Sequence, residues 1–237
     1  MKQGTLYAGR LKQAFNKLKK SSAAPEIPEA DDPLRRLAIG VLGVRDGELA
    51  GTKAVNRLLG QVVDWNEIRV STAFEAQTAI GNTLKDGLAS CETLRTVLQS
   101  VFDKVNRLSL EHLKSLGRRE ARQYLESLEG VDEYAAAGVV LWSLGGHAIP
   151  VDDNLLKALC DGELVNPEAS RAEVQAFLER NIAASDAKAF CILMRDFKPA
   201  SVATPRSKTA KKPARAKSTI AGSGKKKRSA ARVTKKS

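Results

Sequence analysis

The fold is decided by residues 117–159, which read GRREARQYLESLEGVDEYAAAGVVLWSLGGHAIPVDDNLLKAL. Apolar residues at helical spacing predict a first helix that ends near Leu128, and Gly130 then permits a tight turn or a positive φ angle. Residues 134–142 follow directly and are apolar on nearly every side, which indicates a buried helix. The stretch therefore predicts a helix, a hairpin and a second helix, then a loop and a third helix.

A hairpin that leads into a helix is also suited to binding an anion. The first N–H groups of a helix have no partner inside it, and the helix dipole adds partial positive charge at that end. Such a turn can hold one DNA phosphate without any lysine. We therefore predict that Leu128, Gly130 and Val131 belong to a DNA-binding hairpin.

The same helical spacing recurs in the sequence that precedes and follows this stretch. From Pro33 onward, apolar residues return every three or four positions, and strict alternation of apolar and polar residues is absent. Thr72 and Glu75 have the spacing of a capping box. The pattern predicts an all-α domain of roughly eight to ten helices.

Charge divides the chain into three segments. Residues 1–20 carry 6 Lys and Arg and residues 198–237 carry 14, and neither segment has an acidic residue. Residues 21–197 carry 27 Asp and Glu against 19 Lys and Arg, so the middle is acidic. We expect a basic N-terminal helix and linker at residues 1–32, a helical domain at residues 33–197 and a basic tail at residues 198–237.

The basic tail is predicted to be disordered, because Lys, Arg, Ala, Ser, Thr and Pro cannot bury enough surface to offset the entropy lost on ordering. Cations without anions favour salt-sensitive, sequence-independent binding to double-stranded DNA, although simple solubilisation is the alternative. The residues expected to bind DNA here are Lys211, Lys212, Lys225, Lys226, Lys227 and Arg228.

Several classes of protein are not indicated by the sequence. Cys91, Cys160 and Cys191 are 69 and 31 residues apart and form no CxxC or Cys/His cluster, so neither a metal site nor a disulfide framework is expected. No apolar signal region or membrane-length apolar stretch is found. We expect a cytoplasmic protein associated with DNA or the nucleoid, or a nuclear one in a eukaryote, with no obligate protein partner.

On these residues the chain resembles the helix-hairpin-helix, Gly/Pro-Asp superfamily of base-excision DNA glycosylases, most nearly its endonuclease III branch. The family's hairpin, Leu-Pro-Gly-Val-Gly, corresponds to Leu128, Glu129, Gly130, Val131 and Asp132. The family's catalytic aspartate follows a valine in the loop before the next helix, and it corresponds to Asp152 after Val151. The resemblance implies a helical DNA glycosylase fold with Asp152 as the catalytic residue.

Three departures from the family pattern limit this implication. The position of the family's catalytic lysine, 18 residues before Asp152, is occupied by Tyr134, so no Schiff base with the sugar and no strand-cleaving lyase activity are expected. The iron-sulfur cluster needs four cysteines after the last helix, and only Cys191 lies there, so no cluster is expected. Asp132 and Glu133 bring negative charge to the hairpin, which should weaken phosphate binding.

Two side chains are candidates for the reaction, and each has a structural alternative. A carboxylate at Asp152 could stabilise the oxocarbenium character that a sugar develops when its base leaves, or it could cap the next helix. Asp153 and Asn154 are the better capping candidates if Asp152 is catalytic. Tyr134 could stack on an extruded base, or it could belong to the core. His147 is expected to be a structural hydrogen-bonding residue.

The leading hypothesis for the function is a monofunctional DNA N-glycosylase that hydrolyses the glycosidic bond of a damaged or mismatched base. The alternative is a non-catalytic DNA-binding or architectural protein on a glycosylase scaffold. Tyr134, Asp132 and Glu133 favour the alternative, and the spacing from the hairpin to Asp152 favours the enzyme.

Overall fold

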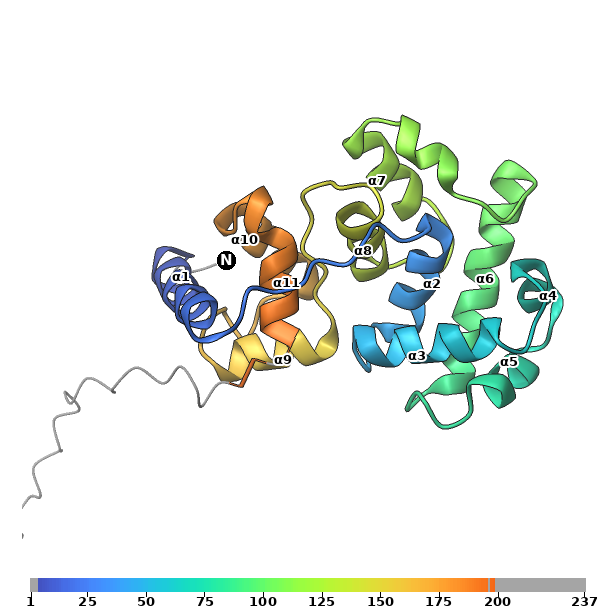
Figure 1. Cartoon of the computed structure of the whole chain (residues 1–237), viewed down its shortest axis with the longest axis horizontal. Helices are drawn as coiled ribbons and strands as arrows, with labels where there is room; N and C mark the ends of the chain where they lie inside the picture. Colours follow the sequence, from blue (N-terminus) through green and yellow to red (C-terminus); the bar gives the residue numbers. More distant parts are fainter. Residues whose placement is uncertain (1–3, 196, 199–237) are drawn as a thin grey trace, which may run out of the picture. The chain divides into compact units, whose positions relative to one another are not determined.

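The computed structural model describes residues 4–195 and 197–198, and these residues contain eleven α-helices, two short 3-10 helices and no strand (Figure 1). The prediction of an all-α fold is therefore confirmed, and the ten α-helices from Pro33 onward in the described residues fall within the range expected for the domain. The tail cations predicted to bind DNA lie outside the described residues. Among the helices that the structure describes, none is long and apolar enough to span a membrane.

The helices follow one another along the chain with mostly short connections. Their bounds are α1 (Gly4–Ser21), α2 (Pro33–Gly43), α3 (Glu48–Leu59), α4 (Trp65–Val70), α5 (Ala73–Ile80), α6 (Gly87–Val105), η1 (Glu111–Ser115), α7 (Arg118–Glu126), α8 (Glu133–Trp142), α9 (Asp153–Asp161), α10 (Arg171–Asn181), η2 (Ala184–Asp186) and α11 (Ala187–Arg195). The predicted capping box is present, because Thr72 and Glu75 exchange side-chain and backbone hydrogen bonds at the start of α5.

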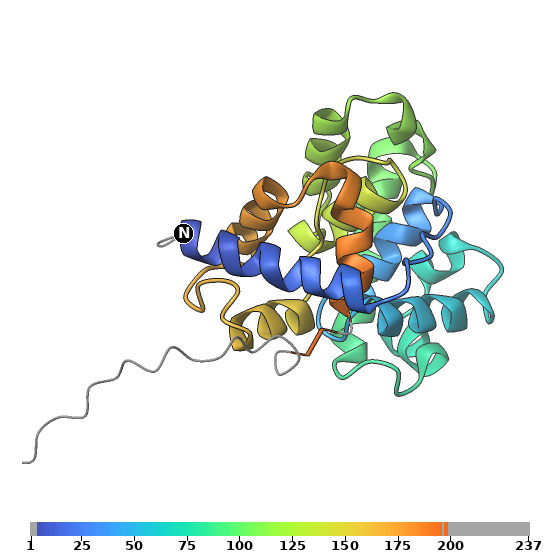
Figure 2. The same cartoon turned by 60° about the vertical axis from the view of Figure 1, so that its left-hand side comes forward.

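The described part of the chain contains two groups of helices. Helices α2 to α8 are contiguous in sequence and pack on one another, with α2 contacting α3, α6 and α8. The second group combines both ends of the sequence, since α1 contacts α10 and α11 (Figures 1 and 2). Helix α11 also contacts α8, which connects the two groups.

Helix α1 is part of the core and is not a separate basic extension. Leu11, Ala14 and Phe15 are buried, and the Phe15 ring packs edge-on against Phe190 of α11 with centroids 5.2 Å apart. Lys19 adds an ion pair with Asp186, at 2.9 Å. Residues 1–32, expected to be a basic helix and linker, thus place a helix whose apolar side packs with α10 and α11.

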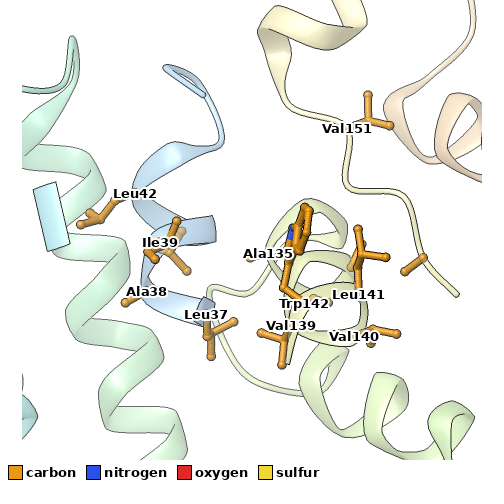
Figure 3. Packing of buried hydrophobic residues seen from close by; sticks show 14 of the residues in the cluster. Leu37, Ala38, Ile39, Leu42, Ala135, Val139, Val140, Leu141, Trp142 and Val151 are labelled. Carbon is orange, nitrogen blue, oxygen red and sulfur yellow. The ribbon is translucent and has the colours of Figure 1, made fainter. Parts of the chain in front are cut away.

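Helix α8 occupies the centre of the fold, as its apolar sequence predicts. Its residues from Tyr134 to Trp142 are all buried, and the helix contacts α2, α7 and α11. Figure 3 shows Leu37 of α2 and Val139 of α8 among the apolar side chains that lie between these helices. The approach is closest at Gly40, where an added Cβ would lie 2.7 Å from the Cα atom of Ala135.

This close approach leads to a prediction about stability. Replacing Gly40 with Ala should lower the free energy of unfolding by about 1–3 kcal/mol, because the new methyl group collides with backbone that cannot move independently. Chemical denaturation of the full chain measures the change.

The matched control is Gly138→Ala in α8, where an added Cβ meets no atom within 4 Å. That substitution should instead stabilise the protein by about 0.5–1 kcal/mol through its effect on helix propensity. Equal effects of the two substitutions would show that the α2–α8 contact is not close-packed.

Candidate functional site

The hairpin at residues 127–132 is held against α6 by its backbone and by Leu128. Leu128 is 3% exposed, so its side chain anchors the turn and does not reach solvent. Gly130 has a φ angle of +84°, and an added Cβ there would lie 3.1 Å from the Val97 side chain. Glycine is therefore required both by the backbone conformation and by the packing on α6.

The exposed part of the hairpin includes Glu129 and the backbone of Gly130. The Glu129 N–H donates to Ser100 Oγ (3.0 Å), and the Val131 N–H donates to the Leu128 carbonyl (3.3 Å). Within the described part of the chain, the N–H groups of Gly130 and Asp132 donate no hydrogen bond. These free donors stand immediately before the N-terminus of α8, so the geometry fits the predicted anion site.

The sequence analysis expected the negative charge of Asp132 to weaken phosphate binding at the hairpin. In the structure the Asp132 carboxylate is paired within the fold. One carboxylate oxygen accepts from the Ala135 N–H (2.8 Å) and caps α8, and the other pairs with Arg171 (3.2 Å). Burial raises the pKa of Asp132, while the Ala135 N–H and the Arg171 guanidinium oppose that rise. The negative charge is therefore satisfied internally, although Glu133 remains exposed.

Arg171 also pairs with Asp153, which follows Asp152 directly. This arginine lies in the first turn of α10, where the helix dipole disfavours a cation. Its two carboxylate partners explain why a cation is stable there. Arg171 thus connects the start of α8, at the hairpin, with the start of α9, at the loop that carries Asp152.

We predict that replacing Arg171 with Met lowers the free energy of unfolding by about 1 kcal/mol, a modest value because the paired side chains remain partly exposed to solvent. The ion pair exists only while the carboxylates are ionised. The difference in the free energy of unfolding between the wild type and the variant should therefore be fully present at pH 7. It should decrease as the pH falls through the pKa of Asp132. Thermal denaturation across this pH range measures it. Arg180→Met, on the exposed face of the same helix, is the control, and an equal, pH-independent loss in both variants would contradict the assignment.

A pocket of about 190 Å³ brings together residues from four separate parts of the chain. Its lining comes from the loop before α3 and the start of that helix, the start of α8, the loop that leads into α9, and α11. The lining residues are Asp46, Gly47, Glu48, Leu49, Tyr134, Pro150, Asp152, Asn154, Leu155, Cys191 and Arg195. Asp152 and Tyr134, both selected from the sequence, therefore lie in one pocket.

Asp152 caps α9, as one of the two alternatives from the sequence holds, and it also lines this pocket. One carboxylate oxygen accepts from the Leu155 N–H (2.7 Å). The other faces Gly47, where an added Cβ would lie 3.5 Å from it. Burial raises the pKa of Asp152, and the N–H groups of Leu155 and Asn154 partly oppose that rise. The expectation that Asp153 or Asn154 would be the cap is wrong, because Asp153 pairs with Arg171 instead.

Tyr134 belongs to the core and also lines the pocket. Its side chain is 6% exposed, packed at the start of α8, and still forms part of the pocket wall. Burial raises the pKa of the Tyr134 hydroxyl well above its ordinary value, and the negative charges of Asp152 and Glu48 raise it further. The phenol therefore stays protonated at neutral pH, and its ring offers an aromatic wall near the Asp152 carboxylate.

Glu48 is a pocket residue that the sequence analysis did not single out. Its carboxylate accepts from Arg36 at 2.5 Å, and Arg36 also pairs with Asp31 and lies over the Trp142 ring at 5.4 Å. Because Arg36 comes from a neighbouring helix, no local spacing could have indicated this pair. Cys191 and Arg195 were missed for the same reason, since α11 meets the pocket only in the tertiary fold.

Of the other side chains weighed in the sequence, Cys191 lines this pocket, whereas His147, Cys91 and Cys160 do not. The His147 ring contacts the Ile182 carbonyl (3.1 Å), in agreement with a structural role. The three cysteines stand on three different helices, α6, α9 and α11, and burial raises the pKa of Cys91 to about 11. Three dispersed cysteines do not fit a four-cysteine cluster, and no group of metal-ligating side chains gathers among the described residues.

Comparison with known proteins identifies the fold. No protein-family model matches the chain, and no curated protein sequence is significantly similar to it. A structure of a non-covalent endonuclease III–DNA complex aligns with a TM-score of 0.61 and 18% identity, over 79% of this chain and 83% of that one. A thermostable thymine-DNA glycosylase aligns with a TM-score of 0.56 and 18% identity, over 86% and 89% of the two chains.

The 3-methyladenine DNA glycosylase MagIII of H. pylori, bound to 1,N6-ethenoadenine, aligns with a TM-score of 0.56 and 15% identity, over 80% of this chain and 95% of that one. The chain therefore has the fold of the helix-hairpin-helix DNA glycosylases, as its resemblance in residues 117–159 implies. Two of the matching structures are of endonuclease III with DNA, the branch of the superfamily that the sequence resembles most.

Proposed function

We propose that this protein is a monofunctional DNA N-glycosylase, which hydrolyses the bond between a damaged or mismatched base and its sugar. The observation that carries the proposal is the meeting of Asp152 and Tyr134 in one pocket. At about 190 Å³ the pocket is smaller than the roughly 300–1,000 Å³ of sites for drug-sized ligands, so it suits a single extruded base. The hairpin supplies free N–H donors that can hold the DNA backbone.

In this mechanism the base leaves the stack and enters the pocket beside the Tyr134 ring. The bond between C1′ and the base nitrogen breaks, and the base departs with the electron pair and takes up a proton from solvent. The Asp152 carboxylate stabilises the positive charge that develops on the sugar. Water then forms the new bond to C1′ and gives up its proton, so the products are a free base and an abasic sugar.

The pocket residues fit base hydrolysis and do not fit strand cleavage. No lysine is among the side chains that line the pocket in the described structure. Lys85, which lies near the pocket, pairs with Asp46 at 3.4 Å. An amine that could form a Schiff base with C1′ is therefore missing from the pocket wall, and Tyr134 keeps its proton.

The central prediction is that Asp152→Asn abolishes release of free base from a duplex that carries the lesion, while binding to that duplex persists. The measurement uses duplexes with uracil, thymine opposite guanine, oxidised pyrimidines or alkylated purines, followed by alkali to cleave abasic sites. Wild-type activity should also fall as the pH drops through the raised pKa of Asp152, because only the carboxylate stabilises the sugar cation.

Stability distinguishes a catalytic loss from misfolding in this variant. Asn caps a helix as well as Asp does, so the cap persists. Because the folded pKa of Asp152 is raised, the ionised carboxylate destabilises the folded state above that pKa, and the Asn variant avoids this cost. Its Tm at pH 7 should equal or exceed that of the wild type. Base release that continues in a folded variant would refute the mechanism.

A second candidate function is a non-catalytic DNA-binding protein on the same scaffold. The observation that favours it is the acidity of the pocket, where Asp46, Glu48 and Asp152 all line the wall. Three carboxylates beside an entering nucleotide oppose its phosphate. Tight binding to every duplex without base release from any of them would support this function and exclude the first.

The basic tail contributes a separate prediction under either function. Removing residues 198–237 takes away 14 cations. Non-specific affinity for duplex DNA should fall, and the dependence of log K on log salt should become shallower, because fewer counterions are released on binding. Fluorescence anisotropy titrations at several salt concentrations measure both quantities. A salt slope unchanged by the deletion would mean that the tail does not contact phosphates.

A further inference from the structure

A second concave surface lies beside the hairpin, on the side that faces α6. It is a groove of about 380 Å³, and it shares no lining residue with the pocket that contains Asp152. Its positive side chains are Arg69 of α4 and Arg95 and Lys104 of α6, and Glu129 of the hairpin also lines it. We call this surface the α6 groove.

The cations of the α6 groove are not neutralised by the carboxylates beside them. Among the described residues, Arg69, Arg95 and Lys104 form no ion pair. Asp103, which also lines the groove, accepts a hydrogen bond from Gln99 instead (2.7 Å). The middle segment of the chain is acidic overall, so an arrangement that leaves three cations unpaired in one groove indicates a use for their charge.

Among the three cations of the α6 groove, Arg95 has the fewest interactions within the described part of the chain. It makes no hydrogen bond with the described part of the chain, and its buried Nε atom has no partner. A buried guanidinium nitrogen without a partner costs free energy, which an incoming acceptor oxygen would recover. The guanidinium donors of arginine match the oxygens of a phosphate in geometry and charge.

The other two cations are held in place by neutral partners. The Arg69 guanidinium donates to Asn66 and to Gln99 (2.6 Å) and lies 4.3 Å from the centre of the Phe102 ring. The Lys104 ammonium group donates to the Ser127 carbonyl (3.0 Å) at the start of the hairpin. Both positions are fixed without loss of charge, so a phosphate would bind with little further ordering of side chains.

The groove and the hairpin form one continuous surface. Ser100 lines the groove and accepts the Glu129 N–H, and the Glu129 side chain lines the groove directly before Gly130. A DNA strand places one phosphate about every 3.4 Å along the helix axis, so a strand held at the hairpin brings further phosphates close by. Asp103 and Glu129 reduce the local positive potential, which limits the expected contact to one phosphate.

We propose that the α6 groove binds a backbone phosphate of duplex DNA next to the phosphate held by the hairpin, through Arg95 with Arg69 and Lys104. The inference rests on the proposed function only in that the chain binds DNA. It does not require Asp152 to be catalytic. It assigns to the acidic domain a phosphate contact that is independent of the basic tail.

The test uses Arg95→Gln in the full chain, because this side chain makes no internal hydrogen bond that the substitution would break. Binding is measured to an undamaged duplex that extends at least one helical turn beyond the hairpin on both sides. The slope of log K against log salt should become shallower by about 0.9, which corresponds to one phosphate contact. Phosphate-ethylation interference should lose one position relative to the wild type.

Two further variants separate this effect from a general change of charge. Arg180→Gln removes one exposed cation from α10 and should leave the interference pattern unchanged. Thr96→Glu adds a carboxylate inside the groove and should weaken binding more than Arg95→Gln does. Circular dichroism and Tm establish that each variant is folded.

The possible outcomes distinguish failure of the groove assignment from failure of the proposed function. If the wild type binds the duplex and both groove variants match Arg180→Gln, the groove assignment is overturned while the proposed function stands. If the wild type binds no DNA, both proposals fail. If inorganic phosphate raises the Tm of the wild type but not of Arg95→Gln, and the DNA salt slope is unchanged, the groove binds a free anion and the DNA assignment is overturned.

Discussion

The complete burial of helix α8 is the constraint on which the rest of the structure depends. The nine residues from Tyr134 to Trp142 form a helical segment that is apolar on nearly every side and must be covered by other elements, and here α2, α7 and α11 cover it. Its first turn therefore lies where the two groups of helices meet. The hairpin enters at that point and Tyr134 lies in the first turn, so the hairpin backbone and the pocket wall are positioned by the same packing.

Helix capping places the charged residues of the site. Asp132 caps α8 and Asp152 caps α9, each through a hydrogen bond from a backbone N–H two or three residues into the helix. Arg171 pairs with Asp132 and with Asp153, so the two helix starts are also connected electrostatically. The proposed chemical role of Asp152 uses the same carboxylate that caps α9. The carboxylate is held rigidly by the cap, and its remaining oxygen is free to face the pocket.

The electrostatics of the chain explain how an acidic domain can approach DNA. Backbone N–H groups at the hairpin attract a phosphate without any net charge, and the unpaired cations of the α6 groove add positive potential beside them. In the proposed function, the 14 cations after residue 197 add long-range attraction to DNA. Asp46, Glu48 and Asp152 line the pocket, where the proposed reaction would develop positive charge on the sugar.

The sequence by itself determined the all-helical fold, the hairpin and the buried helix after it, and it singled out Tyr134 and Asp152, which line one pocket. These features rest on short-range patterns: apolar periodicity, a glycine at a tight turn, and the spacing between two motifs. Only the tertiary structure decided that α1 belongs to the core, that Asp152 rather than Asp153 is the cap, and that Glu48, Cys191 and Arg195 share its pocket. The Arg171 bridge and the α6 groove were also invisible in the sequence. The physical reason is that each depends on side chains from helices distant in the chain, whose meeting is set by packing and not by local propensity.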